Sequence, residues 1–203
     1  LDEAHKSLGR ESTEIIKNFP NSVRVGFTAT SEYTEEKTLK KLLNNEIFRM
    51  EIDEAIMAGM LSSARTFVVK THVDISSVSV KSGKYSDGEL AQAVNIQGRN
   101  KLAIDTYLNG QHVDGDKIDK FNGKSVIAFC VNISHANDLA NLFNDAGVPA
   151  AVITEKTKEI ERDELIKNLK KGEIKILCSV DVLRDGFDAP NASICLNLRP
   201  TMS

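Results

Sequence analysis

Two adjacent carboxylates and a histidine at the start of the chain could do hydrolytic chemistry. Asp2, Glu3 and His5 stand in the string Asp2-Glu3-Ala4-His5. Hydrolysis of ATP needs one acid that holds hydrated Mg²⁺ and a second group that orients or deprotonates the attacking water. An Asp and a Glu side by side can divide these two roles. A charged helix start accounts for the same four residues equally well.

A pair of hydroxyl side chains forms the second candidate group. Thr28 and Thr30 lie in the string Gly26-Phe27-Thr28-Ala29-Thr30, at the end of a strand predicted over Val23–Thr28. From a strand end, two hydroxyls could bond a neighbouring histidine or carboxylate. The competing interpretation is two β-favouring threonines that cap the next helix.

The C-terminal half alternates short apolar runs with amphipathic helices. The runs predict strands at Val126–Val131, Ala150–Ile153, Ile174–Val180 and Ser193–Leu198. Helices are predicted at Ser134–Ala146, with Ser134 as the N-cap, and at Thr157–Lys171, closed by Gly172. Their inner faces are predicted to be Leu139, Ala140, Leu142, Phe143 and Ala146, and Ile160, Leu165, Ile166 and Leu169. The alternation predicts an α/β fold with a parallel sheet covered on both faces, which binds ligands at the carboxyl ends of its strands.

The N-terminal half has a weaker pattern. Helical spacing predicts helices at Thr13–Phe19, Thr34–Leu43, Asp53–Leu61 and Glu89–Leu108, the last broken at Gly98. Thr66–Ile75 reads as a half-buried strand, and Ser82–Gly88 and Gln111–Gly123 read as loops. Gly123-Lys124-Ser125 looks like the end of a phosphate-binding loop, but a strand follows it where a helix is required, so it predicts a turn.

The composition is that of an ordinary globular protein. A formal net charge of -3 leaves no global basic surface for nucleic acid, so any such contact must be local. The three cysteines lie in apolar runs and predict buried free thiols in a reducing compartment, which we take to be the cytoplasm. His72, His112 and His135 show no metal spacing, and His135 is predicted to be solvated. We expect no membrane segment.

In this order, the two candidate groups resemble motifs II and III of superfamily 2 DEAD/DEAH-box helicases, and the resemblance continues downstream. Ser125–Gly147 resembles motif IV with its helix, and Thr154–Arg162 resembles the T-x-x-x-E-R segment of relatives. Ile176–Ser203 contains GFDAP and RPTMS, and it resembles motif V of the branch that holds repair helicases and restriction-enzyme motor subunits.

The resemblance implies a role for each matching residue. Asp2 would bind Mg²⁺ with ATP, Glu3 would activate the water, and His5 would relay the nucleotide state; Thr28 and Thr30 would couple the domains. Gly186 and Asp188 match the ATP-binding positions of motif V. Candidate contacts to nucleic acid are Ser179, Asn132, Ser134 and Arg184. Beside Ser179, Val180 stands where relatives frequently have a threonine. The alternative role for Asn132 and Ser134 is to cap a helix. The alternative for Arg184 is a solvated side chain without a ligand contact.

The resemblance also implies the domain organisation. Residues 1–52 would be the remnant of a first RecA-like ATPase domain, and residues 53–203 a second RecA-like domain truncated before the arginine-rich motif VI. Because the segment lacks that motif and a phosphate-binding loop, we expect it to hydrolyse almost no ATP by itself. The full protein would be an ATP-dependent helicase or translocase with Mg²⁺, acting more on DNA than on RNA. A motor subunit of a type I or type III restriction enzyme and a non-enzymatic binding or regulatory module are the alternatives.

Overall fold

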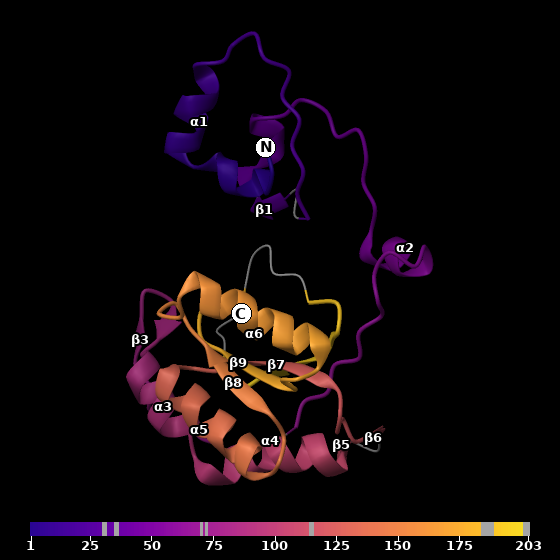
Figure 1. Ribbon diagram of the computed structural model, residues 1–203. Helices are drawn as coiled ribbons and strands as arrows, with labels where there is room; N and C mark the ends of the chain where they lie inside the picture. Colours follow the sequence, from indigo (N-terminus) through magenta and orange to yellow (C-terminus); the bar gives the residue numbers. More distant parts are fainter. Residues whose placement is uncertain are drawn as a thin grey trace. The chain divides into compact units, whose positions relative to one another are not determined.

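The computed structural model describes residues 1–29, 32–34, 37–69, 71, 73–113, 116–183 and 189–200. The chain divides into two compact units, Leu1–Arg65 and Thr66–Ser203 (Figure 1). Asp53–Arg65, expected to belong to the second domain, therefore group with the N-terminal unit. The domain limits 1–52 and 53–203 stay a prediction.

A parallel four-stranded sheet forms the centre of the C-terminal unit. Its strand order is β10-β7-β9-β8, and each neighbouring pair is parallel. The strands are β7 (Ser125–Phe129), β8 (Ala150–Ile153), β9 (Ile176–Ser179) and β10 (Ala192–Asn197). The predicted α/β fold is thereby confirmed, and the carboxyl ends of all four strands lie at one edge.

Helices cover both faces of this sheet (Figure 1). Alternate residues of β7 divide between the faces: Val126 and Ala128 pack in one core with Phe143 of α5 (Ile133–Asp145), while Ile127 packs with Leu169 of α6 (Glu159–Lys171). The Phe143 side chain is 0% exposed, and burial of such a side chain stabilises the fold by roughly 1.5–3 kcal/mol.

The caps and inner faces of the two helices agree with the prediction only in part. Asn132 caps α5, because its side-chain oxygen accepts a hydrogen bond of 2.9 Å from the backbone N–H of His135, so the predicted cap at Ser134 is wrong. Gly172 ends α6 in the left-handed conformation, with φ 76, as predicted. Ala146 and Ile160 are exposed, so their predicted places on the inner faces are wrong.

The segment before the sheet contains two helices and two short hairpins. The predicted long helix is divided into α3 (Asp87–Val94) and α4 (Gln97–Asn109), two residues before Gly98. The predicted loop at Gln111–Gly123 contains a strand pair, and the predicted loop at Ser82–Gly88 contains one strand of a second pair. The described residues of Thr66–Ile75 contain no strand. The pairs are β3 (Val80–Lys81) with β4 (Lys84–Tyr85), and β5 (Gln111–Val113) with β6 (Asp116–Ile118). Gly123, with φ 85, lies in the predicted turn before β7.

The N-terminal unit has short elements. They are η1 (Ala4–Leu8), α1 (Arg10–Lys17), β1 (Glu32–Thr34), β2 (Lys37–Thr38), η2 (Leu39–Lys41) and α2 (Ile52–Met57). The predicted helix at Thr34–Leu43 is wrong, since a hairpin strand and one 3-10 turn occupy its described part. The predicted strand at Val23–Thr28 is an extended segment without strand assignment.

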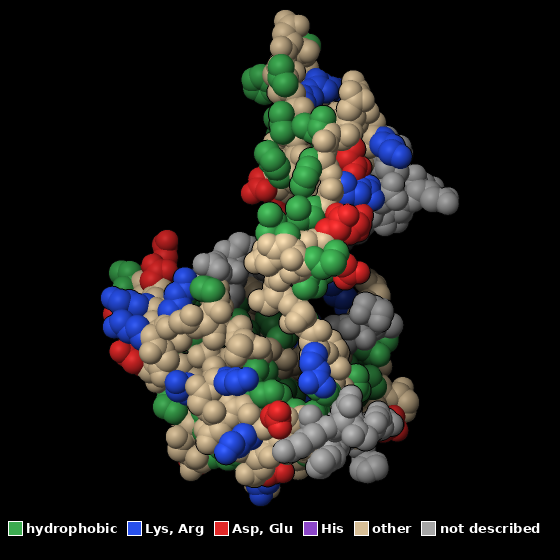
Figure 2. Space-filling model, turned by 90° about the vertical axis from the view of Figure 1, so that its right-hand side faces the viewer, with side chains coloured by type: hydrophobic (Ala, Val, Ile, Leu, Met, Phe, Trp, Pro, Cys, Tyr) green, Lys and Arg blue, Asp and Glu red, His purple; other side chains and the backbone are tan. Residues whose placement is uncertain are grey.

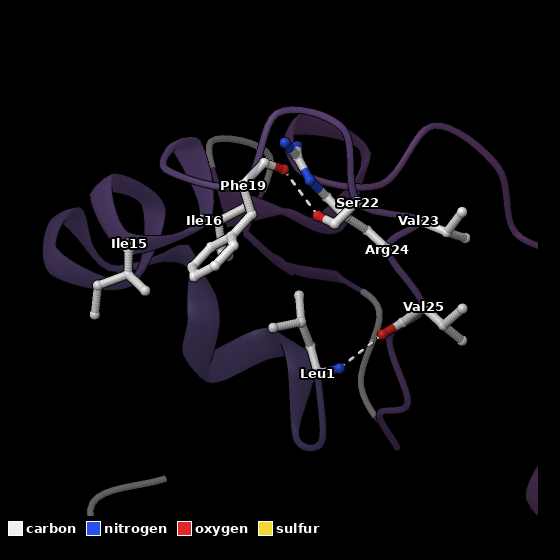
Figure 3. Close-up of a pocket in the computed structure, with 8 residues that line it drawn as sticks. All are labelled: Leu1, Ile15, Ile16, Phe19, Ser22, Val23, Arg24 and Val25. Carbon is white, nitrogen blue, oxygen red and sulfur yellow. Dashed lines mark hydrogen bonds between the residues drawn. The ribbon is translucent and has the colours of Figure 1, made fainter.

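Large hydrophobic side chains remain on the surface of the N-terminal unit. Figure 2 shows several of them grouped, and Phe19, Val23 and Phe27 are among the exposed ones. A pocket near the N-terminus is lined by Leu1, the end of α1 and the segment that follows (Figure 3). In contrast, the described buried hydrophobics of this unit are Ala4, Leu39 and Ala55.

The cysteines are free, but they differ in exposure. Cys130 and Cys178 are buried as predicted, and their mutual hydrogen bond, together with burial, raises the pKa of Cys178. Cys195 is exposed, so the prediction of an inaccessible thiol is wrong at this position. The reason is that β10 is an edge strand whose alternate side chains face outward. Within the described ranges, no helix has the length and hydropathy to cross a membrane.

Candidate functional site

The first candidate group lies directly beside the second. The N-terminal amine of Leu1 donates to the carbonyl of Val25 at 2.7 Å, Phe27 N–H donates to Leu1 O at 2.9 Å, and Ala4 N–H donates to Phe27 O at 2.9 Å. The first two bonds have the pattern of parallel strands, and the third comes from Ala4, at the start of η1. The structure therefore aligns the Asp2-Glu3-Ala4-His5 string with the Gly26-Phe27-Thr28 string, as their proposed common role requires.

Gly26 permits this close approach. A Cβ at this position would lie 2.5 Å from Leu43 Cδ1 and 3.0 Å from the Cβ of the buried Ala4. Any larger residue would push the two segments apart or displace Leu43. The glycine of the second string is therefore needed for packing at the site, and its role does not depend on a positive φ.

The side chains of the two strings meet at His5. Its Nδ1 lies 2.7 Å from Thr28 Oγ1 and 3.3 Å from Glu3 Oε2. Asp2 Oδ1 accepts a hydrogen bond of 2.9 Å from Glu3 N–H. Asp2 and Glu3 are exposed, whereas His5 and Thr28 are partly buried. The cluster thus presents two carboxylates to solvent, and the imidazole links one of them, that of Glu3, to the hydroxyl of Thr28.

Glu3 has an unusual backbone. Its φ of 46 and ψ of 51 place it in the left-handed region, which costs energy for a residue with a side chain. Such residues persist where the surroundings fix them, and here the flanking ladder bonds and the Asp2 carboxylate do so. This conformation changes the direction of the backbone at Glu3, directly before η1 begins at Ala4.

The donor set of the cluster fits one hydrated metal ion that is shared with a phosphate. Mg²⁺ is commonly held by one or two carboxylates together with substrate phosphates and waters. Asp2 offers an exposed carboxylate of this kind. The described part of the chain contains no group of three or more metal-binding side chains, so a site built of protein ligands alone is not found there.

The other candidates belong to the C-terminal unit or lie outside the described residues. Thr30, Arg184, Gly186 and Asp188 lie outside them. Ser134 is exposed on the first turn of α5. Asn132 uses its side-chain oxygen as the helix cap, which was the structural alternative.

Ser179 is the most deeply buried of these candidates. It is 0% exposed, and its hydroxyl donates a hydrogen bond of 2.8 Å to the carbonyl of Val182. This geometry favours the local role over a contact with phosphate. The sequence could not show it, because the turn that brings Val182 back contains two residues of positive φ, Asp181 and Leu183.

We therefore expect Ser179→Ala to act on stability. Loss of the buried hydrogen bond should cost about 0.5–1.5 kcal/mol of unfolding free energy. Chemical denaturation of this chain measures that loss, with the exposed Ser193→Ala as the control that should show none. In the full-length protein, affinity for single-stranded nucleic acid should stay at the wild-type value. A large loss of affinity with unchanged stability would instead support the hypothesis that Ser179 contacts phosphate.

His135 belongs to a polar network that sequence reasoning missed. The ring is 0% exposed, so the prediction of a solvated side chain is wrong. Its Nε2 lies 3.2 Å from Asn100 Oδ1, and its Nδ1 accepts a bond of 3.4 Å from Val131 N–H. Asn100 and Asn95 continue the chain of hydrogen bonds to Asp138. Burial and the nearby Arg99 lower the pKa of His135 to about 4.

Comparison with known proteins agrees with this architecture. The family model "Helicase conserved C-terminal domain" matches residues 111–203. A protein of Saccharomyces cerevisiae named "Putative ATP-dependent helicase IRC3" is 30% identical over all of this chain and 29% of its own length. A 51.5 kDa protein of a Lactococcus phage is 26% identical over all of this chain and 42% of its own length.

A solved structure shares the fold. A variant of Dbp5 from S. cerevisiae, bound to RNA and ADP BeF3, has a TM-score of 0.51 at 20% identity; the match covers 99% of this chain and 44% of that one. The chain thus spans less than half the length of the relatives it matches. Residues 111–203 therefore form a helicase C-terminal domain of the superfamily 2 type.

Proposed function

We propose that the full-length protein is an ATP-dependent helicase or translocase of the DEAH-box type that acts on DNA. The observation that carries this proposal is the contact of 2.7 Å between His5 Nδ1 and Thr28 Oγ1. It joins the string that resembles motif II to the string that resembles motif III. Similarity to a named ATP-dependent helicase across the whole chain supports the same activity.

Each side chain of the cluster has a distinct task in this proposal. Asp2 holds Mg²⁺, which would neutralise charge on the phosphates of bound ATP. Glu3 orients the attacking water and accepts its proton. His5, between Glu3 and Thr28, transmits a change at the carboxylates to the motif III segment. Thr30, Gly186 and Asp188 keep their proposed coupling and ATP-binding roles.

The remaining assignments follow from the resemblance. DNA is favoured because the quoted motif V form resembles that of repair helicases and restriction-enzyme motors. Among the nucleic-acid candidates, the exposure of Ser134 leaves its hydroxyl accessible. We propose the cytoplasm as the location. A restriction-enzyme motor subunit remains the second candidate, and a nuclease motif elsewhere in the full protein would favour it.

The proposal is tested on the full-length protein. We expect Mg²⁺-dependent ATP hydrolysis that single-stranded DNA stimulates more than RNA of the same length. A steady-state phosphate-release assay with matched DNA and RNA oligonucleotides measures both. Hydrolysis without any response to nucleic acid would contradict the helicase, and absence of hydrolysis would favour the non-enzymatic module. Stronger stimulation by RNA would overturn the choice of DNA.

A further inference from the structure

A strained turn follows the central strand β9 at the edge of the sheet where its strands end. Asp181 has φ 54 and Leu183 has φ 62, so two residues with side chains adopt the left-handed region within three positions. Such strain costs energy at each residue and persists where surrounding contacts fix it. It is common at sites where a backbone must take one specific direction.

One arginine bridges the turn to two other parts of the unit. Arg199 Nη1 donates to Asp181 Oδ1 at 2.7 Å, and Arg199 Nη2 donates to Asp87 Oδ1 at 3.1 Å. Asp181 directly follows β9 and Val180, Asp87 begins α3, and Arg199 follows β10. These segments are distant in sequence, so the guanidinium makes tertiary contacts, and we call the pair of contacts the Arg199 tie. The buried Ser179 adds a further contact, since its hydroxyl donates a hydrogen bond to the carbonyl of Val182 in the same turn.

The length and shape of arginine suit this position. Because β7 lies between β10 and β9, the side chain must reach across two strand spacings, roughly 10 Å. The planar guanidinium can serve two carboxylates at once, whereas an ammonium group is a single point charge. Helix α3 in turn packs on Val131, which follows the end of β7. One side chain thus ties together the ends of the strands β9 and β10 and the start of α3.

We propose that Arg199 is a positioning residue, which fixes the turn Asp181–Leu183 at the carboxyl end of β9. This inference rests on the proposed function, because Gly186 and Asp188, the proposed ATP contacts, follow this turn in the sequence. The Arg199 side chain is 24% exposed and its two partners are more exposed, so the tie contributes little to global stability. Its proposed role is to fix the orientation of the turn.

The first test measures the turn directly in the full-length protein. Arg199→Ala should speed hydrogen exchange of the amides in Val180–Leu183 by about tenfold, since the turn opens locally, and leave α5 and the melting temperature unchanged. Arg199→Lys should give an intermediate rate. The matched control is Lys171→Ala, which removes an exposed ion pair of 3.6 Å with Glu173 at the other edge of the sheet. Unchanged exchange in the turn, or faster exchange throughout the unit, would overturn the proposal.

The second test measures turnover. In the same protein, Arg199→Ala should lower kcat for ATP by about 10- to 100-fold, because a displacement of about 1 Å at a contacting group can cost a factor of this order. Lys171→Ala should turn over at the wild-type rate. Faster local exchange with unchanged kcat would refute the link to catalysis. If the wild-type protein hydrolyses no ATP, the proposed function fails, and the exchange result alone decides whether Arg199 positions the turn.

Discussion

Glu3→Gln is expected to lower kcat for ATP in the full-length protein by about 10²–10⁴-fold while ATP affinity stays near the wild-type value. Glutamine preserves the size of the side chain but cannot accept a proton at neutral pH. In the structure, the exposed carboxylate lies beside Asp2, and its Oε2 is 3.3 Å from His5 Nδ1. The substitution therefore removes the proposed base without removing Asp2 as the Mg²⁺ ligand.

Two measurements on one preparation separate chemistry from binding. Phosphate release under saturating ATP gives kcat, and titration with a fluorescent ATP analogue gives affinity. Glu11→Gln, an exposed position in the first turn of α1, is the matched control and should be neutral in both. Turnover near wild type in Glu3→Gln would exclude Glu3 as the base. A parallel loss of affinity would instead assign Glu3 to nucleotide binding.

The parts of the fold that the sequence predicted are those governed by local pattern. The strand at Ala150–Ile153 was predicted to the residue, since four apolar residues between polar or turn segments leave few alternatives. The end of α6 at Gly172 followed from the conformational freedom of glycine. The predicted helix at Thr34–Leu43 failed because three leucines at helical spacing support only one turn, which the structure forms at Leu39–Lys41.

The candidate site divides in the same way. The pairing of His5 with Thr28 was predictable, because both follow extended segments whose motifs were recognised in order. The hydrogen bond from the Ser179 hydroxyl to Val182 was not predictable, since it depends on backbone angles at Asp181 and Leu183 that those residue types do not suggest. The tie formed by Arg199 joins residues that no sequence spacing relates. Long-range tertiary contacts therefore account for most of what the sequence did not reveal.

His135 illustrates such a contact and has a measurable consequence for stability. The ring is buried in the network between α4 and α5, where Arg99 opposes its protonation and Asp138 favours it. Desolvation has the largest effect, and the pKa of His135 falls from its ordinary 6.5 to about 4 in the folded chain. Between these values the unfolded chain binds a proton at this site that the folded chain does not. Stability must therefore decrease as the pH is lowered through that window.

We expect the free energy of unfolding of this chain to fall by roughly 3 kcal/mol between about pH 7 and pH 4 on account of His135, beyond the contribution of other groups. The sign follows from the depressed pKa: the contribution is complete above the unfolded value and is lost on acidification. His135→Gln keeps a polar side chain but cannot titrate, so its stability curve should be flatter over the same range. Urea denaturation of both proteins at several pH values measures the difference. Parallel curves for the two would show that His135 is protonated as easily in the folded chain as in the unfolded one, and the buried network would then carry no pH dependence.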